Sequence, residues 1–140
     1  MSDETGSVPI WFLGLAFCLL MLGAMSAELW RIIGDRQELV ALADGAAIAA
    51  ASAVDLDHYR STGEALLDPD DARTLALSVL SRTSGGANLA AVPLVIVADD
   101  RRSVRVELHR RVPFGLIQFL PLDDDGFDVS GVAVAYPYSP

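Results

Sequence analysis

The acidic run near the C-terminus has the most obvious potential for chemistry in this sequence. Asp123-Asp124-Asp125-Gly126-Phe127-Asp128 places four carboxylates within six residues, and hard cations such as Ca²⁺ bind several carboxylate oxygens. An EF-hand loop, however, requires acids at alternate positions before its glycine and a glutamate six residues after it. The run meets neither condition, so we do not expect a calcium site.

Other reactive residue types are too few or too scattered for a catalytic or metal site. The two histidines, His58 and His109, and the single cysteine, Cys18, do not make a zinc ligand set. The serines lack a G-x-S-x-G elbow, and Gly85-Gly86 is not followed by the lysine and helix of a phosphate-binding loop. We therefore expect no enzymatic activity, no catalytic residue, no cofactor and no metal.

The charge of the chain excludes some partners. A net charge of −9, with ten arginines and no lysine, opposes binding to nucleic acid, which requires a basic patch. It also opposes docking on anionic lipid surfaces. We interpret the pairs Arg101-Arg102 and Arg110-Arg111 as solubilising charges at a sheet edge.

The elements that position these residues are organised around an apolar run. Val8 to Ala27 holds twenty residues without a charge, bounded by Asp3 and Glu4 before it and Glu28 after it. About 20 apolar residues in a helix cross the hydrocarbon layer of a bilayer. We predict a membrane span in contact with lipid, marked along its length by Val8, Trp11, Leu15, Leu19, Gly23 and Ala27.

A cleaved signal peptide is the alternative explanation of this run, because Ala24-Met25-Ser26 has the small residues of a cleavage site. The acidic leader and the length of the run favour a retained span. Helical character also continues beyond it, since Ala41 to Ala53 contains eight alanines. We predict one helix over residues 8–54, roughly 70 Å long at 1.5 Å per residue.

Charged residues follow the span at helical spacing. Glu28, Arg31, Asp35 and Glu38 lie on one side of the helix, and Glu28–Arg31 and Arg31–Asp35 are expected to pair. They form either a solvated face or charge pairs between subunits. The opposite, apolar stripe consists of Leu29, Ile32, Ile33, Val40, Ala43 and Ala47, interrupted by Arg36.

Small residues on this helix predict close helix packing. Gly23-x-x-x-Ala27 allows another backbone to approach within the membrane. Since one span is predicted, Gly23 and Ala27 would face either another subunit or lipid, and we favour a subunit, which could be a second copy in a homo-oligomer. For Ala43 to Ala50, including Ala47, we expect the chain's own small domain to be the neighbour.

The rest of the chain predicts a small α+β domain. Asp55 to Leu67 is expected to be a connector or a broken helical turn. Asp68 caps a second helix with Pro69 at its first position. The apolar face of that helix is formed by two pairs at i, i+4 spacing, Leu75 with Val79 and Ala76 with Leu80. The helix is expected to end at Ser84-Gly85-Gly86.

Three strands are expected after this helix. Ala91 to Ala98 and Ser103 to Val112 form a hairpin, in which Val104, Val106 and Leu108 alternate with Arg105, Glu107 and His109. Phe127 to Tyr136 is the third strand. Between them, Pro113 to Pro121 is expected to form two helical turns, followed by the acidic loop.

The fold class is therefore α+β. A long N-terminal membrane-spanning helix precedes a small domain with a three-stranded antiparallel sheet and one or two short helices. We divide the chain into a tail (1–7), the helix (8–54) and the small domain (55–140).

Gly6 to Asp55 resembles the N-terminal module of the TadE/TadG-like proteins of the tight-adherence (Flp) pilus system. The likeness rests on Gly6-Ser7-Val8 before the span, Glu28 and Arg31 after it, and the stretch from Arg36 through Leu39 and Ala43 to Ala51. One departure concerns processing. Members that are cleaved carry a glutamate five residues after the cleavage-site glycine, and in this sequence the fifth residue after Gly6 is Trp11.

The resemblance implies a pilin-like protein of the cytoplasmic membrane, single-pass, that serves pilus assembly as a minor pilin or scaffold. Its partners would be other pilus-assembly membrane proteins or pilin subunits, and its C-terminal domain would be extracytoplasmic. Counting Arg31 and Arg36 by the positive-inside rule gives the opposite orientation. The alternative function is a single-pass sensor or regulatory subunit acting through its small domain.

Overall fold

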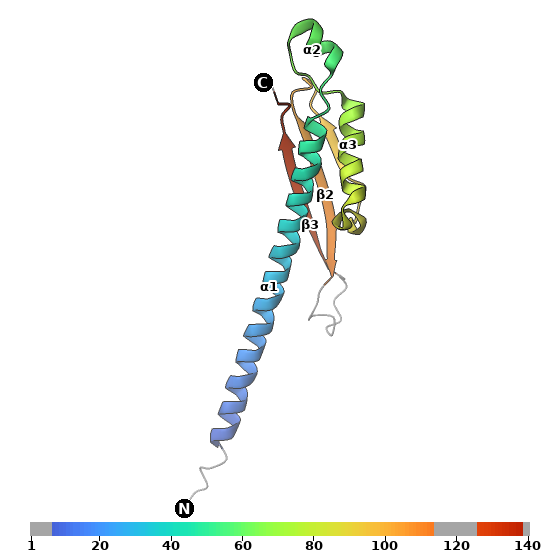
Figure 1. Cartoon of the computed structure of the whole chain (residues 1–140). Coiled ribbons are helices and arrows are strands. Elements are labelled where there is room, and N and C mark those ends of the chain that lie inside the picture. Colours follow the sequence, from blue (N-terminus) through green and yellow to red (C-terminus); the bar gives the residue numbers. More distant parts are fainter. Residues whose placement is uncertain (1–6, 114–125, 139–140) are drawn as a thin grey trace, which may run out of the picture.

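The computed structural model describes residues 7–113 and 126–138. In chain order they form helices α1 (Ser7–Ala51), α2 (Leu56–Thr62) and α3 (Pro69–Arg82), a short 3-10 helix η2 (Ser84–Asn88), and strands β1 (Leu94–Val97), β2 (Val104–Pro113) and β3 (Gly126–Ala135). Figure 1 shows a long helix whose second half lies on a small sheet. The predicted α+β class is confirmed.

Helix α1 is a single element of 45 residues. It runs without a break through Ala24-Met25-Ser26 and through the charged residues that follow. A helix of this length is about 67 Å long at 1.5 Å per residue. The predicted continuous rod is therefore present.

The three strands form one antiparallel sheet in the order β1-β2-β3. Val106 of β2 pairs with Val95 of β1 and with Ala133 of β3, so these three side chains share one face. Along β2, Val104, Val106 and Leu108 are buried, as their alternation predicts. Strand β1 begins later than expected because Pro93, just before it, has no N–H to give to the ladder.

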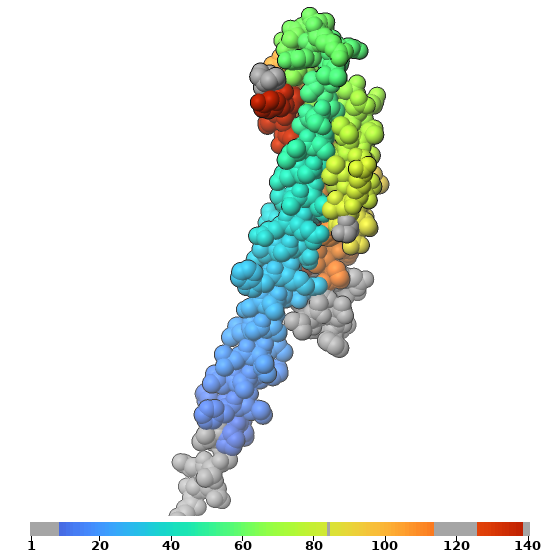
Figure 2. Space-filling model, in the orientation of Figure 1, coloured from blue at the N-terminus to red at the C-terminus, as the bar shows by residue number. Residues whose placement is uncertain are grey.

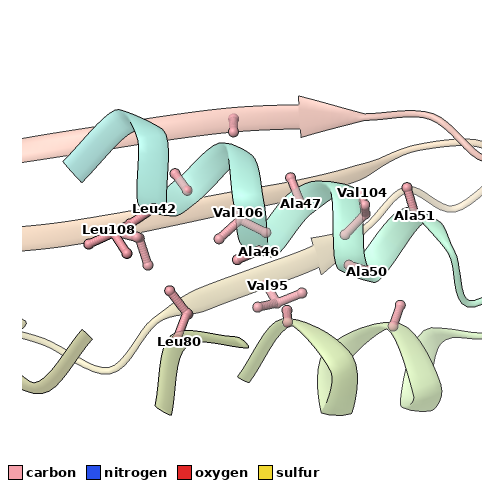
Figure 3. Close-up of a cluster of buried hydrophobic side chains, with 14 of the residues drawn as sticks. Leu42, Ala46, Ala47, Ala50, Ala51, Leu80, Val95, Val104, Val106 and Leu108 are labelled. Atoms are coloured by element: carbon pink, nitrogen blue, oxygen red, sulfur yellow. The ribbon is translucent and has the colours of Figure 1, made fainter. Parts of the chain in front are cut away.

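The second half of α1 and all of α3 cover this one face of the sheet (Figures 1 and 3). The buried α1 residues are mostly alanines, which let the helix lie close to both the sheet and α3. The core residues are Leu39, Leu42, Ala43, Ala46, Ala47 and Ala50 from α1, Ala72, Ala76 and Leu80 from α3, and Val95, Val104, Val106 and Leu108 from the sheet.

Part of the predicted apolar faces is wrong. Leu29 and Ile33 of the α1 stripe are 58% and 48% exposed, whereas Leu39 and Leu42 are buried. On α3, Leu75 is exposed and Ala72 is buried in its place. In both helices apolar residues occur on more than one side, so periodicity alone does not select the buried side. Contact with the sheet and α3 selects it for α1, and contact chiefly with α1 selects it for α3.

Close approach of α1 to the sheet depends on a glycine in β3. A Cβ added to Gly131 would lie 3.0 Å from the backbone carbon and oxygen of Leu39. Real Cβ contacts are seldom this short, so any larger residue would push α1 away from β3.

The segment expected to be a connector or a broken helical turn contains helix α2. The Asp55 carboxylate accepts a hydrogen bond from the His58 N–H, and the helix ends at Gly63 with φ of 77°. Only glycine adopts this left-handed conformation at little cost. The helical turns were expected within Pro113 to Pro121, and all of this stretch after Pro113 lies outside the described residues. The acidic loop Asp123 to Asp125 also lies outside them.

Candidate membrane anchor and its junction with the domain

The first half of α1 carries apolar side chains that no other described part of the chain covers. Trp11, Leu15 and Leu19 are 79%, 58% and 61% exposed, and Figure 2 shows this half as a bare shaft below the domain. Val8 lies within the helix, but its surroundings are outside the described residues. By length and composition, Pro9–Ala51 is the one described helix able to cross a membrane.

The two small residues of the predicted packing motif lie on this shaft. A Cβ added to Gly23 would meet no atom within 4 Å, and Ala27 is exposed. Both positions are therefore open to lipid or to another chain. Which of the two covers them stays a prediction.

Ala43 and Ala47 have a different environment. They are 0% and 1% exposed and belong to the core cluster that α1 forms with the sheet and α3; Ala47 is labelled in Figure 3. The chain's own small domain is their neighbour, so they present no surface to a separate subunit.

Arg31 joins the shaft to the domain. Its guanidinium Nη2 lies 2.6 Å from Oε1 of Glu28 and donates a hydrogen bond of 2.8 Å to the carbonyl oxygen of Pro113, the last residue of β2. The first predicted charge pair is therefore formed. Among the described residues no ion pair joins Arg31 to Asp35, because the guanidinium is directed to Glu28 and Pro113 instead.

Arg110 lies under the same end of the sheet and is only 8% exposed. It donates hydrogen bonds of 2.9 Å to the Gly85 carbonyl and 3.4 Å to Oε2 of Glu38. The interpretation of Arg110 as an edge charge is wrong, because β2 is the central strand and Arg110 occupies its inward-facing side. Arg110 instead links α1, η2 and the sheet.

Gly85 is the residue that makes room for this arginine. A Cβ at this position would lie 2.6 Å from Cδ1 of Leu42 and 2.7 Å from Oε1 of Glu38. The glycine thus serves close packing of η2 on α1, and no phosphate site is required to explain it.

A polar hollow of about 650 Å³ opens between α1, η2 and β2. Its lining includes Arg31, Asp35, Glu38, Arg110 and Arg111, so cations and carboxylates are mixed. The helix side that carries Arg31, Asp35 and Glu38 thus faces η2 and the end of β2. The face is therefore only partly solvated, and charge pairing between subunits stays a prediction.

The described residues do not group potential metal ligands. They contain no group of three or more His, Cys, Asp or Glu side chains placed to hold a metal ion. The thiol of Cys18 is free and exposed on the shaft. The site is therefore a hydrophobic anchor with a polar junction.

The roles of two residues, Arg110 and Gly131, were not predicted from the sequence. Arg110 has the same place in the strand alternation as the inward-facing Leu108 and Val112. Because arginine is charged, we nevertheless predicted a solvent-exposed side chain. Gly131 occurs between Ser130 and Val132 in a strand, where an isolated glycine does signal a close backbone approach.

The helix that bears both anchor and junction is also the part of the chain that comparison identifies. Residues 6–53 match the family model described as "Tad: Putative Flp pilus-assembly TadE/G-like". This segment matches the TadE/G-like family. The resemblance predicted from Gly6 to Asp55 is confirmed over these residues, about a third of the chain. Comparisons with curated proteins and with solved structures gave no match.

The TadE/G-like match ends within three residues of the end of α1. It therefore covers the exposed shaft and the stretch of α1 buried under the domain. The match supports a role in pilus assembly.

Proposed function

We propose that this protein is a non-enzymatic, membrane-anchored component of tight-adherence (Flp) pilus assembly, acting as a minor-pilin-like subunit or scaffold. The observation that carries the proposal is the division of α1. Its first half is an exposed apolar shaft, its second half is built into the core of a small domain, and the TadE/G-like match covers both.

A rigid connection between anchor and domain supports this role. Leu39 and Ala43 of α1 are core residues of the domain, and Arg31 ties the shaft to Pro113. A subunit that transmits position from the membrane to an assembling fibre needs such stiffness. The sensor alternative has no observation of its own in its favour.

In this proposal the domain lies on the extracytoplasmic side, and Gly23 and Ala27 contact another assembly subunit within the membrane. Leucine at both positions keeps the span lipid-soluble but blocks close backbone approach. We expect Gly23→Leu/Ala27→Leu to insert normally and to lose cross-linking to partner subunits together with pilus assembly.

The matched control is Gly14→Leu, at another glycine of the shaft with no atom within 4 Å of an added Cβ. It should preserve assembly. If the double variant cross-links and assembles pili as the unsubstituted chain does, the packing role of these residues is wrong. Recovery of the chain in sheared pili identifies a minor pilin, whereas retention in the membrane fraction identifies a scaffold.

A further inference from the structure

Two tryptophans mark the limits of the apolar shaft. Trp11 and Trp30 are 79% and 76% exposed. They lie 19 residues apart, which is about 28 Å along an α-helix, close to the roughly 30 Å of a hydrocarbon layer. Tryptophan favours the boundary between hydrocarbon and headgroups. The boundary on the side of the domain therefore lies at Trp30. Arg31 holds the Glu28 carboxylate close to this boundary.

The sheet ends at the same level along α1 as Trp30. Pro113, whose carbonyl accepts the hydrogen bond from Arg31, pairs across the sheet with Gly126. The end of β2 and the start of β3 thus meet α1 one residue beyond Trp30. A headgroup layer of roughly 5–8 Å covers the next three to five residues of a helix, so it includes this end of the sheet. With the boundary at Trp30, no free stretch of helix would separate membrane and domain, since the end of β2 already contacts Arg31.

An exposed aromatic residue occurs at this end of the sheet. Phe127, the second residue of β3, is 50% exposed and borders a hollow of about 350 Å³ shared with Ile32 and Arg36 of α1. Leu29 and Ile33 of α1 are 58% and 48% exposed. Leu29 belongs to the shaft just before Trp30, and Ile33 and Phe127 extend its exposed apolar surface past Trp30.

The exposed charges at this height suit a headgroup layer. Arg36 and Arg111 are exposed, and Arg111 lies opposite Asp128 in the sheet register. Long arginine side chains reach lipid phosphates while their stems stay on apolar surface. Lipid is thus the neighbour that matches both the apolar and the charged groups.

From this arrangement we infer that the base of the domain, defined as Phe127 with Leu29, Ile32 and Ile33, rests in the headgroup layer of the bilayer that α1 spans. Phe127 is a second lipid contact, separate from the span. Together with the span it fixes the tilt of the domain on the membrane. The inference rests on the proposed anchoring by α1 and is independent of the role in pilus assembly.

Depth-dependent quenching in vesicles tests this contact. The full chain is reconstituted in phosphatidylcholine/phosphatidylglycerol vesicles containing lipids brominated near the headgroup or near the acyl-chain end. Three single-tryptophan chains are compared, with other tryptophans replaced by Phe: native Trp30, Phe127→Trp and Tyr138→Trp. Tyr138 is 82% exposed and follows the far end of β3, where Ala135 pairs with Val104.

We expect shallow bromines to quench Phe127→Trp within about twofold of Trp30, and to leave Tyr138→Trp unquenched, because only the base lies at the boundary. If only Trp30 is quenched, and Phe127→Trp is no more quenched than Tyr138→Trp, the membrane anchor is supported and the lipid contact of the base is wrong. If none of the three tryptophans is quenched, the proposed membrane anchoring by α1 is itself wrong.

A second probe covers the case in which Phe127→Trp does not fold. Asp128→Cys labelled with bimane, in a Cys18→Ala chain, reports the same height from an exposed neighbouring position. Quenching by shallow bromines supports the lipid contact. Concentration-dependent cross-linking between Asp128→Cys chains without lipid quenching would show that a second copy covers the base, and the inference would then be wrong.

Discussion

At the scale of single residues, the buried arginine is the most informative position. Truncation of Arg110 to Ala removes the hydrogen bond to the Gly85 carbonyl and leaves a gap between η2 and β2. We expect it to lower the free energy of unfolding by about 2 kcal/mol, measured by urea denaturation in detergent micelles. Arg105→Ala, at an exposed position of the same strand, should change it by less than about 0.5 kcal/mol.

The partner carboxylate matters less than the arginine. The Glu38 side chain is 54% exposed and its ion pair with Arg110 is 3.4 Å long, so Glu38→Gln should cost no more than about 0.5 kcal/mol. Equal effects of Arg110→Ala and Arg105→Ala in the same assay would mean that the guanidinium does not hold the junction together.

Two glycines provide an opposed pair of substitutions. Gly131→Ala puts a Cβ 3.0 Å from the Leu39 backbone and should destabilise the domain by about 1–3 kcal/mol through overpacking. Gly45→Ala places its Cβ in open space on the exposed side of α1 and should stabilise by up to about 1 kcal/mol, since alanine is the better helix former. Melting of the two variants followed by circular dichroism would show shifts of opposite sign. Shifts of the same sign would contradict the close approach at Gly131.

At the scale of elements, α3 depends on its N-cap. Oδ1 of Asp68 accepts hydrogen bonds of 2.9 and 3.1 Å from the backbone N–H groups of Asp70 and Asp71. Asp68→Ala should destabilise the domain by about 1 kcal/mol. Asp57→Ala is the control, because the Asp57 side chain is 97% exposed and its removal should leave the urea midpoint unchanged. A midpoint for Asp68→Ala that coincides with that of Asp57→Ala would show that the cap is dispensable.

Helix α1 combines two elements with different partners in one rod. Up to Trp30 its large apolar side chains are exposed, and from Leu39 onward the side that faces the sheet and α3 carries mostly small, buried side chains. The intervening stretch carries Arg31, Asp35 and Glu38, the charged residues of the junction. In the proposed anchoring, this change from large exposed to small buried side chains would place the domain directly beside the membrane.

At the scale of the whole molecule, the proposed orientation makes a testable prediction. If the domain is extracytoplasmic, alkaline phosphatase fused after Pro140 will be active, because this reporter folds only when exported, and a fluorescent cytoplasmic reporter at the same point will be dark. The opposite result would favour the orientation obtained from Arg31 and Arg36 by the positive-inside rule and would refute the proposed pilus role.

Some properties were determined by the sequence alone. The charge-free run from Val8 to Ala27 and the alanines up to Ala53 predict a continuous helix, since helix formation there is local and tolerant of context. The alternation in β2 predicts that Val104, Val106 and Leu108 face one way, because side chains alternate along any strand. The cap Asp68-Pro69 likewise acts within one turn. The TadE/G-like resemblance also lies entirely in this locally determined helix.

Only the tertiary structure decided which sides of these elements meet. Leu29 and Leu39 are equally apolar, yet one is exposed and the other is buried, because the sheet covers only the second half of α1. Arg110 is buried because Gly85 and Glu38, distant in sequence, supply its hydrogen-bond acceptors. The base of the domain lies beside Trp30 because Arg31 reaches Pro113 across 82 residues of chain. Such contacts depend on the docking of elements, which no local pattern encodes.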